Sequence, residues 1–177
     1  MTFVGHILMG ETVGAALLPP KKTKKWKTLY FVILGLVANI PDFQLPFWGH
    51  HRYYYVSHSI FANSLLILLF VSLFAVWKKL RDAVGGWKTV AAGSLAWLSH
   101  LLLDTFYNQE KGLMMFWPVS EARLRLAMPW FSVVKTLPPP ITPDHIKIAL
   151  IELAFYGSLL IIVVCVRFII QEMRKDH

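Results

Sequence analysis

Charged residues, cysteine and signal-peptide features are all scarce in this sequence. Asp, Glu, Lys and Arg make up 16% of the 177 residues, against about 25% in a typical soluble domain. The single cysteine, Cys165, lies within an apolar run, which excludes a disulfide framework. The first lysine, Lys21, follows the first apolar stretch. That stretch therefore does not have the pattern of a secretory signal peptide, in which a basic region comes first.

Several catalytic motifs are also missing. The sequence contains no P-loop, no glycine pattern of a dinucleotide-binding fold, no HExxH and no GxSxG. Nucleotide-driven chemistry and serine hydrolysis are therefore not expected. The formal net charge of +8 would fit a nucleic-acid partner. The basic residues flank apolar runs, however, so we expect them at a membrane surface and expect no nucleic acid.

Hydrophobic residues dominate the chain, at 56% of its length, with a mean hydropathy of +0.52. They gather in five apolar segments. These segments span residues 3–18, 29–40, 60–77, 87–106 and 146–170. The pattern predicts an all-α polytopic integral membrane bundle of about five membrane helices. We expect one membrane domain over residues 1–177, with a long outer loop at 107–145.

The positions of the basic residues predict an orientation. Lys and Arg concentrate at 21–27, at 78–88 and at the C-terminal end. Such segments stay on the cytoplasmic side of a membrane, and five crossings bring all three to one side. We therefore expect an integral protein of the cytoplasmic (plasma) membrane, with its C-terminus in the cytoplasm and its N-terminus outside.

Histidines and two aspartates gather at the predicted outer ends of these segments. His100 and Asp104 are four residues apart, so in a helix they project from one face. Ionisable groups inside a membrane are costly and mark function by default. His nitrogens and carboxylate oxygens are ligands of Zn²⁺, Mn²⁺ or Fe, so we predict a divalent metal site, with Zn²⁺ favoured. Its candidate ligands are His6, Asp42, His51, His58, His100 and Asp104.

These motifs resemble the YdjM-like family of membrane-bound metal-dependent hydrolases. The resemblance rests on His6, Pro41-Asp42, His51-Arg52, Ser57-His58-Ser59, Ser99-His100-Leu-Leu-Leu-Asp104, and Gly112 followed by Trp117-Pro118. It covers residues 3–118, and the segment at 146–170 carries no motif that matches. One departure is Gln44, which stands where the family usually has a second acid. The resemblance implies a membrane protein that hydrolyses its substrate with a bound metal.

The predicted function is metal-dependent hydrolysis at the outer membrane face, through a metal-bound hydroxide. A site at the lipid interface suggests a phosphoester or lipid-linked substrate, with membrane lipids as partners. Asp42 or Asp104 would act as a general base. Arg52 would bind a phosphate or carboxylate group, and Asn39 could orient a ligand.

Other interpretations of the same residues stay open. His100 and Asp104 could form a polar pair that hydrogen-bonds across the bundle, and Arg52 could extend to lipid headgroups. Glu11 and Glu152 lie deeper in apolar segments, where a partner within the bundle is favoured over a role in the site. A different class of function is a non-enzymatic metal-binding, transport or scaffold protein that uses the same cluster.

Overall fold

The computed structural model describes residues 2–19, 23–49, 53–107, 112–126, 128–133 and 141–173. Within these ranges the chain is all-helical, with isolated β-bridges and no β-strand. This confirms the predicted helical class. The helices are α1 (Phe3–Leu17), α2 (Lys24–Val37), the 3-10 turn η1 (Ile40–Asp42), α3 (Tyr54–Ser57), α4 (Ile60–Val76), α5 (Lys78–Ala83), α6 (Trp87–Asp104) and α7 (Pro143–Met173).

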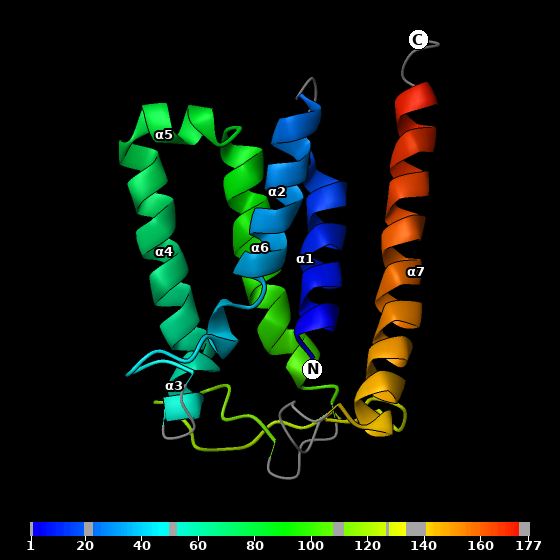
Figure 1. Ribbon diagram of the computed structural model, residues 1–177. Helices are drawn as coiled ribbons and strands as arrows, with labels where there is room; N and C mark the ends of the chain where they lie inside the picture. Colours follow the sequence, from blue (N-terminus) through cyan, green and yellow to red (C-terminus); the bar gives the residue numbers. More distant parts are fainter. Residues whose placement is uncertain are drawn as a thin grey trace.

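Five helices, α1, α2, α4, α6 and α7, run roughly alongside one another, and their directions alternate along the chain (Figure 1). The short helix α5 lies across one end of the bundle, which we call the α5 end. Helix α3 and the longer loops lie at the opposite end, the α3 end, where α1, α4 and α7 begin and α2 and α6 finish (Figure 1). The predicted site residues that the structure describes fall at the α3 end.

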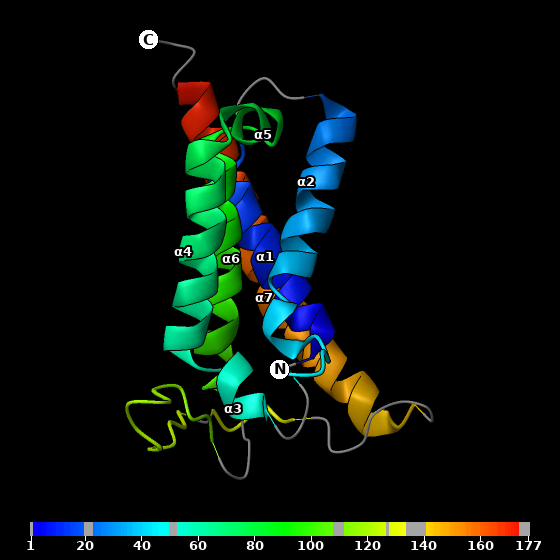
Figure 2. The same cartoon turned by 90° about the vertical axis from the view of Figure 1, so that its left-hand side faces the viewer.

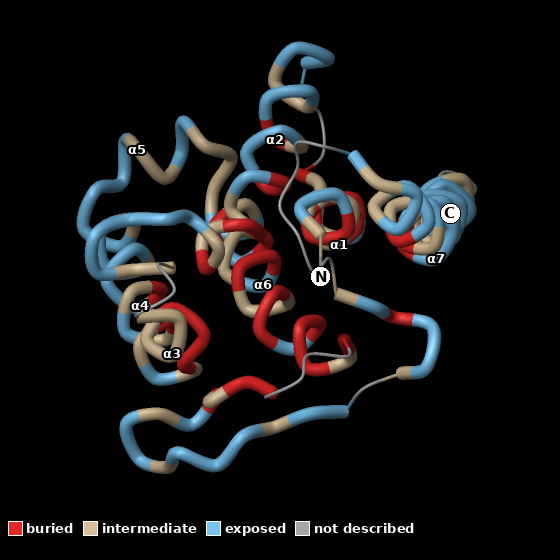
Figure 3. The backbone as a smooth tube through the Cα atoms, turned by 60° about the horizontal axis from the view of Figure 1, so that its bottom comes forward, coloured by how far each residue is buried: buried red, intermediate tan, exposed pale blue. Residues whose placement is uncertain are grey.

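Helix α1 is the centre of the bundle, because it packs against α2, α6 and α7. Its glycines permit the close approach to α2. A Cβ at Gly10 would lie 2.5 Å from the backbone oxygen of Leu34, and one at Gly14 would lie 2.6 Å from the Leu34 side chain. Figure 3 shows burial concentrated on α1 and α6, while most of α7 is exposed.

Local capping explains where the helices begin. The Thr23 side chain accepts a hydrogen bond from the backbone N–H of Trp26, so α2 starts at Lys24 rather than at residue 29, where its apolar run begins. Ser59 caps α4 in the same way, accepting from the backbone N–H groups of Phe61 and Ala62.

Length and composition distinguish α7 from the other described helices. It has 31 residues, a mean hydropathy of 2.5 over its most apolar 18-residue window, and 6% of that window buried. Among the helices that the structure describes, α7 alone is long and apolar enough to cross a membrane by these measures. Helices α1 and α4 are apolar but shorter. The structure thus shows the five predicted helices without establishing that each one spans a bilayer.

Candidate metal centre

Five of the predicted site residues meet at the α3 end. His6 comes from the first turns of α1, Asp42 from η1, and His58 from the residue after α3. His100 and Asp104 come from the last turns of α6, on one face, as their spacing predicts. The three histidines are fully buried. Asp104 is almost fully buried, whereas 37% of the Asp42 side chain is exposed.

Four of these residues bring ligand atoms close together. The Nε2 atoms of His58 and His100 are 3.3 Å apart. Each lies 3.3 to 3.6 Å from Oδ1 of Asp42 and from Oδ2 of Asp104. Ligands bound tetrahedrally to Zn²⁺ at 2.0–2.1 Å are separated by about 3.3 Å. The arrangement of Asp42, His58, His100 and Asp104 therefore fits a metal ion.

Backbone carbonyls orient the two imidazoles. The carbonyl of Ala38 lies 2.8 Å from Nδ1 of His100, and that of Tyr54 lies 3.1 Å from Nδ1 of His58. A carbonyl only accepts hydrogen bonds, so Nδ1 of His100 carries the proton. Nδ1 of His58 also lies 2.9 Å from the Ser57 hydroxyl, which donates to the Tyr54 carbonyl and so accepts from this Nδ1. In the neutral rings, both Nε2 atoms then present lone pairs. Two lone pairs 3.3 Å apart repel each other unless a proton or cation lies between them. Metal-binding histidines are commonly held in this way.

His6 approaches the cluster from another side. Its ring stacks on that of His100, with centroids 3.7 Å apart. Its Nε2 atom lies 3.3 Å from Oδ1 of Asp104 and 3.8 Å from Oδ2 of Asp42. His58 and His100 face the other oxygen of each of these two carboxylates. Both ring nitrogens are buried without a hydrogen-bond partner among the described residues. Such an orphaned pair is unusual in a folded protein, and it supports His6 as a further ligand.

The two site groups outside the long helices have strongly shifted pKa values. Burial alone would raise the pKa of Asp42, but the hydrogen bonds and charges of His100 and His58 outweigh it and hold this pKa well below its usual range. Burial would lower the pKa of His58, but Asp104 and Asp42 raise it to about 9. These shifts favour the anionic form of Asp42 and the protonated form of His58, and a metal ion would take the place of that proton.

A second layer of polar groups, not anticipated from the sequence, supports His58. The side-chain amide of Asn63 on α4 donates to the backbone carbonyls of Ser57 and Ser59, at 2.8 and 2.7 Å. Its oxygen accepts from the indole N–H of Trp97 on α6, at 2.6 Å. This links both neighbours of His58 to α4 and α6. The only sequence signal was an asparagine within an otherwise apolar segment.

Asn39, which could have oriented a ligand, does not do so in the structure. The Asn39 amide donates to the backbone carbonyl of Gly35 in the last turn of α2, at 2.8 Å. Ligand orientation at His100 is provided by the backbone of Ala38 instead. Gln44 is exposed. His51 and Arg52 lie outside the described residues.

The carboxylate of Glu152 on α7 is buried at the start of α1. It accepts hydrogen bonds from the backbone N–H groups of Thr2 and Gly5, at 2.8 and 3.1 Å, and from the hydroxyl of Thr2. Glu152 therefore caps the helix that carries His6. The sequence favours a partner for Glu152 within the bundle. That partner is the N-terminus of α1.

Fold and site together define an all-helical protein of membrane-type composition with a histidine and aspartate cluster that fits a metal ion. A family model described as YdjM inner membrane protein matches residues 1–174, so the chain belongs to this family. The match confirms the resemblance and extends it beyond residue 118 through α7. It also supports a membrane location. Neither the curated proteins nor the solved structures include a match to this chain.

Proposed function

We propose that the protein is a membrane-embedded, metal-dependent hydrolase that acts on a phosphoester or lipid-linked substrate. The observation that carries the proposal is the convergence of the His58 and His100 Nε2 atoms with the Asp42 and Asp104 oxygens. A divalent ion held there would polarise a bound phosphoryl or carbonyl oxygen and activate water near neutral pH.

The exposure of Asp42 favours catalysis over a purely structural metal. Structural sites enclose the ion, whereas catalytic sites keep one position open. His6, His58, His100 and Asp104 are buried, so the cluster faces its surroundings through Asp42. This carboxylate is held as an anion. With the histidines and Asp104 holding a single ion, Asp42 would be free to accept the proton of the attacking water; with two ions bound, it would serve as a ligand instead.

The position of His6 suggests a second metal ion. It faces Oδ2 of Asp42 and Oδ1 of Asp104, while His58 and His100 face the other oxygen of each carboxylate. Carboxylates that bridge two ions recur in hydrolytic two-metal sites. We propose His6 as a ligand on this second side. His51, as a further ligand, and Arg52, as a contact to substrate phosphate, stay predictions from the sequence.

The proposed substrate class follows from location. The family is one of inner membrane proteins, and the cluster lies at one end of the helical bundle, near the proposed membrane interface. We propose that α1, α2, α4, α6 and α7 all cross the membrane, with the α3 end on the outer face. The described basic residues at the α5 end, such as Lys24, Lys25 and Lys78, support this orientation.

A non-enzymatic metal-binding, transport or scaffold role is the alternative class. A transporter would need polar groups that continue from the cluster through the bundle. Glu152 is engaged in capping α1 and Glu11 is the other acid within an apolar helix, so the described residues offer no continuous polar path. This observation favours a site at one membrane face.

Metal analysis of purified wild-type protein, combined with a phosphoesterase and lipase panel, tests the proposal. The double substitution His100→Ala/Asp104→Ala should abolish both stoichiometric metal and hydrolysis. The matched control is Asp144→Ala/His145→Ala at the start of α7, which removes the same residue types elsewhere and should preserve both.

The outcomes separate the two classes of function. Metal content unchanged by His100→Ala/Asp104→Ala would refute the metal centre. Metal that is lost in this variant, together with no hydrolysis by the wild-type protein, would favour the non-enzymatic class.

A further inference from the structure

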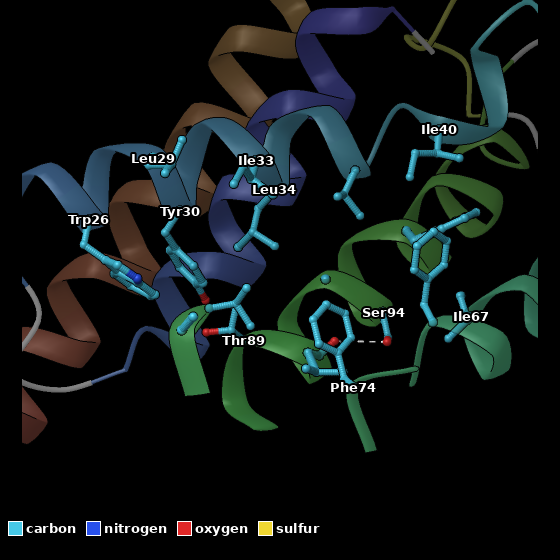
Figure 4. A pocket seen from close by; sticks show the side chains of 17 residues that line it. Trp26, Leu29, Tyr30, Ile33, Leu34, Ile40, Ile67, Phe74, Thr89 and Ser94 are labelled. Carbon is cyan, nitrogen blue, oxygen red and sulfur yellow. Dashed lines mark hydrogen bonds between the residues drawn. The ribbon is translucent and has the colours of Figure 1, made fainter. Parts of the chain in front are cut away.

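An apolar groove lies where α2, α4 and α6 meet. Its volume is about 360 Å³, at the small end of the range for ligand pockets. Helices α2 and α4 each pack against α6, and Figure 2 shows α2 standing apart from α4 and α5. Figure 4 shows Trp26 at one end of the groove and Ile40 and Ile67 at the other.

Three polar groups in the groove lining are engaged, and a fourth, the Thr89 hydroxyl, is buried without a hydrogen-bond partner among the described residues. The Tyr30 hydroxyl donates to a backbone carbonyl of α1, and the Ser94 hydroxyl donates to one in its own helix. The Trp97 indole donates to Asn63. Because these donors are engaged, the groove suits a hydrocarbon chain better than a polar ligand.

The groove ends beside the metal centre. Ile40, in its lining, is two residues before Asp42 in η1. Trp97 lies one helical turn before His100 on α6, and through Asn63 it is bonded to both neighbours of His58. A chain lying in the groove would therefore present its polar end to the cluster.

The groove is somewhat longer than one membrane leaflet is deep. Its lining runs along α2 from Trp26 to Ile40, which corresponds to about 20 Å of helix. The hydrocarbon core of a bilayer is about 30 Å thick, so one leaflet is about 15 Å deep. The groove is long enough for one lipid chain, and its volume suits a single chain rather than a whole lipid.

We propose that this groove binds one acyl chain of a membrane phospholipid and thereby delivers the phosphate-bearing head to the His/Asp cluster. The proposal rests on the proposed hydrolase function for its substrate role. Chain binding itself can be measured without any hydrolysis. The groove is distinguished from the exposed apolar surface of α7 by its position, because Ile40 and Trp97 in its lining lie two and three residues before Asp42 and His100 in the chain.

Gly93 provides a way to fill the groove without disturbing the fold. It lines the groove, and a Cβ built there would have Leu34 Cδ2 as its nearest neighbour, at 4.0 Å. Gly93→Leu therefore places an apolar side chain in the groove and removes a helix-destabilising glycine. The matched control is Gly157→Leu on α7, where the nearest atom to a new Cβ is 3.8 Å away and belongs to a flexible Leu153 side chain.

The test uses the full chain in vesicles of phosphatidylethanolamine and phosphatidylglycerol, with a phospholipid that carries a diazirine on its acyl chain. Labelled peptides are mapped by mass spectrometry. We expect wild-type labelling to concentrate on the groove residues of α2, α4 and α6. Gly93→Leu should lower that labelling about tenfold or more, because each methylene displaced from apolar contact weakens binding roughly fourfold. Gly157→Leu should leave it unchanged.

Three results would overturn the groove assignment. One is equal labelling of Gly93→Leu and wild type. Another is groove labelling no stronger than that of α7, which would reflect ordinary lipid contact. The third is groove labelling that disappears as the protein-to-lipid ratio is raised, which would identify the groove as an interface between copies of the chain.

A kinetic arm connects the groove to hydrolysis. Gly93→Leu should raise KM for a long-chain phospholipid and leave the hydrolysis of a soluble phosphodiester, bis(p-nitrophenyl) phosphate, unchanged. Equal effects on both substrates would count against chain binding as the route to the site. Absence of all hydrolysis in wild type would refute the enzyme while the labelling result still decides the groove.

Discussion

The first turns of α1 contribute to two buried polar clusters, one around His6 and one around the Glu152 carboxylate of α7. Around Glu152, two backbone N–H groups and the Thr2 hydroxyl are donors directed at one anion. Around His6, carboxylate oxygens and imidazole nitrogens face one another, and the His6 nitrogens have no hydrogen-bond partner among the described residues. The first cluster is satisfied by the protein alone, whereas the second has the geometry of a possible metal site.

Helix α7 also contacts the other end of α1. Its Arg167 guanidinium donates to the backbone carbonyls of Ala15, Ala16 and Leu18, where α1 ends. An acid at the N-terminus and a base at the C-terminus both complement the helix dipole. The α7 contacts thus hold α1 in place, whereas we propose that the cluster that α1 helps to build binds a metal ion. The comparison therefore predicts that substitutions in the two clusters will affect different properties.

The largest expected effect comes from Asp104→Asn. The change keeps the size of the side chain and removes the anionic ligand that contacts His6, His58 and His100. Changes to groups that only support a ligand lower metal affinity by 10- to 100-fold, so we expect about 1,000-fold for a ligand itself. Competition with a chromogenic chelator measures the affinity, with the exposed Asp82→Asn as control. Metal affinity within threefold of wild type would contradict the assignment.

The next effect should be on stability and not on metal. Glu152→Ala leaves the backbone N–H groups of Thr2 and Gly5 buried without an acceptor. The expected cost is about 2–3 kcal/mol in free energy of unfolding, measured by denaturant titration in detergent. Glu152→Gln keeps an acceptor oxygen and should cost less, and the exposed Glu121→Ala should cost nothing measurable.

The comparison would fail if Glu152→Ala removed the metal and left the stability unchanged. That result would place Glu152 in the metal centre rather than in the fold.

The two clusters also differ in how far the sequence predicts them. His100 and Asp104 were predictable because helical spacing alone brings them together, and the alternating helix directions bring His6, Asp42 and His58 to the same end. The partners of Glu152 were not predictable, since they lie 147 and 150 residues away in the chain. Backbone groups satisfy this acid, and a sequence carries no pattern that reveals such contacts.

The fold shows the same limit. Five apolar segments predicted five helices, and the family match and the structure bear out the helical membrane class. Trp97 donates a hydrogen bond to Asn63, and Asn63 donates to the backbone carbonyls of both neighbours of His58. These hydrogen bonds depend on how α4 packs against α6. Side-chain periodicity predicts that a helix exists, but not which neighbour it packs against.

The smallest expected effect concerns the other end of α1. Arg167→Met keeps much of the apolar length of the side chain and removes its donors to the α1 carbonyls. Favourable contacts of a cation with a helix C-terminus contribute about 1 kcal/mol, so unfolding should become easier by about that amount. Arg167→Lys keeps the charge but not the fork of donors, and should retain part of the stability. Because Arg167 lies at the end of α1 away from His6, the metal stoichiometry should be unchanged in both variants. A loss of metal in either one would show that the position of α1 as a whole, rather than its first turns alone, determines the site.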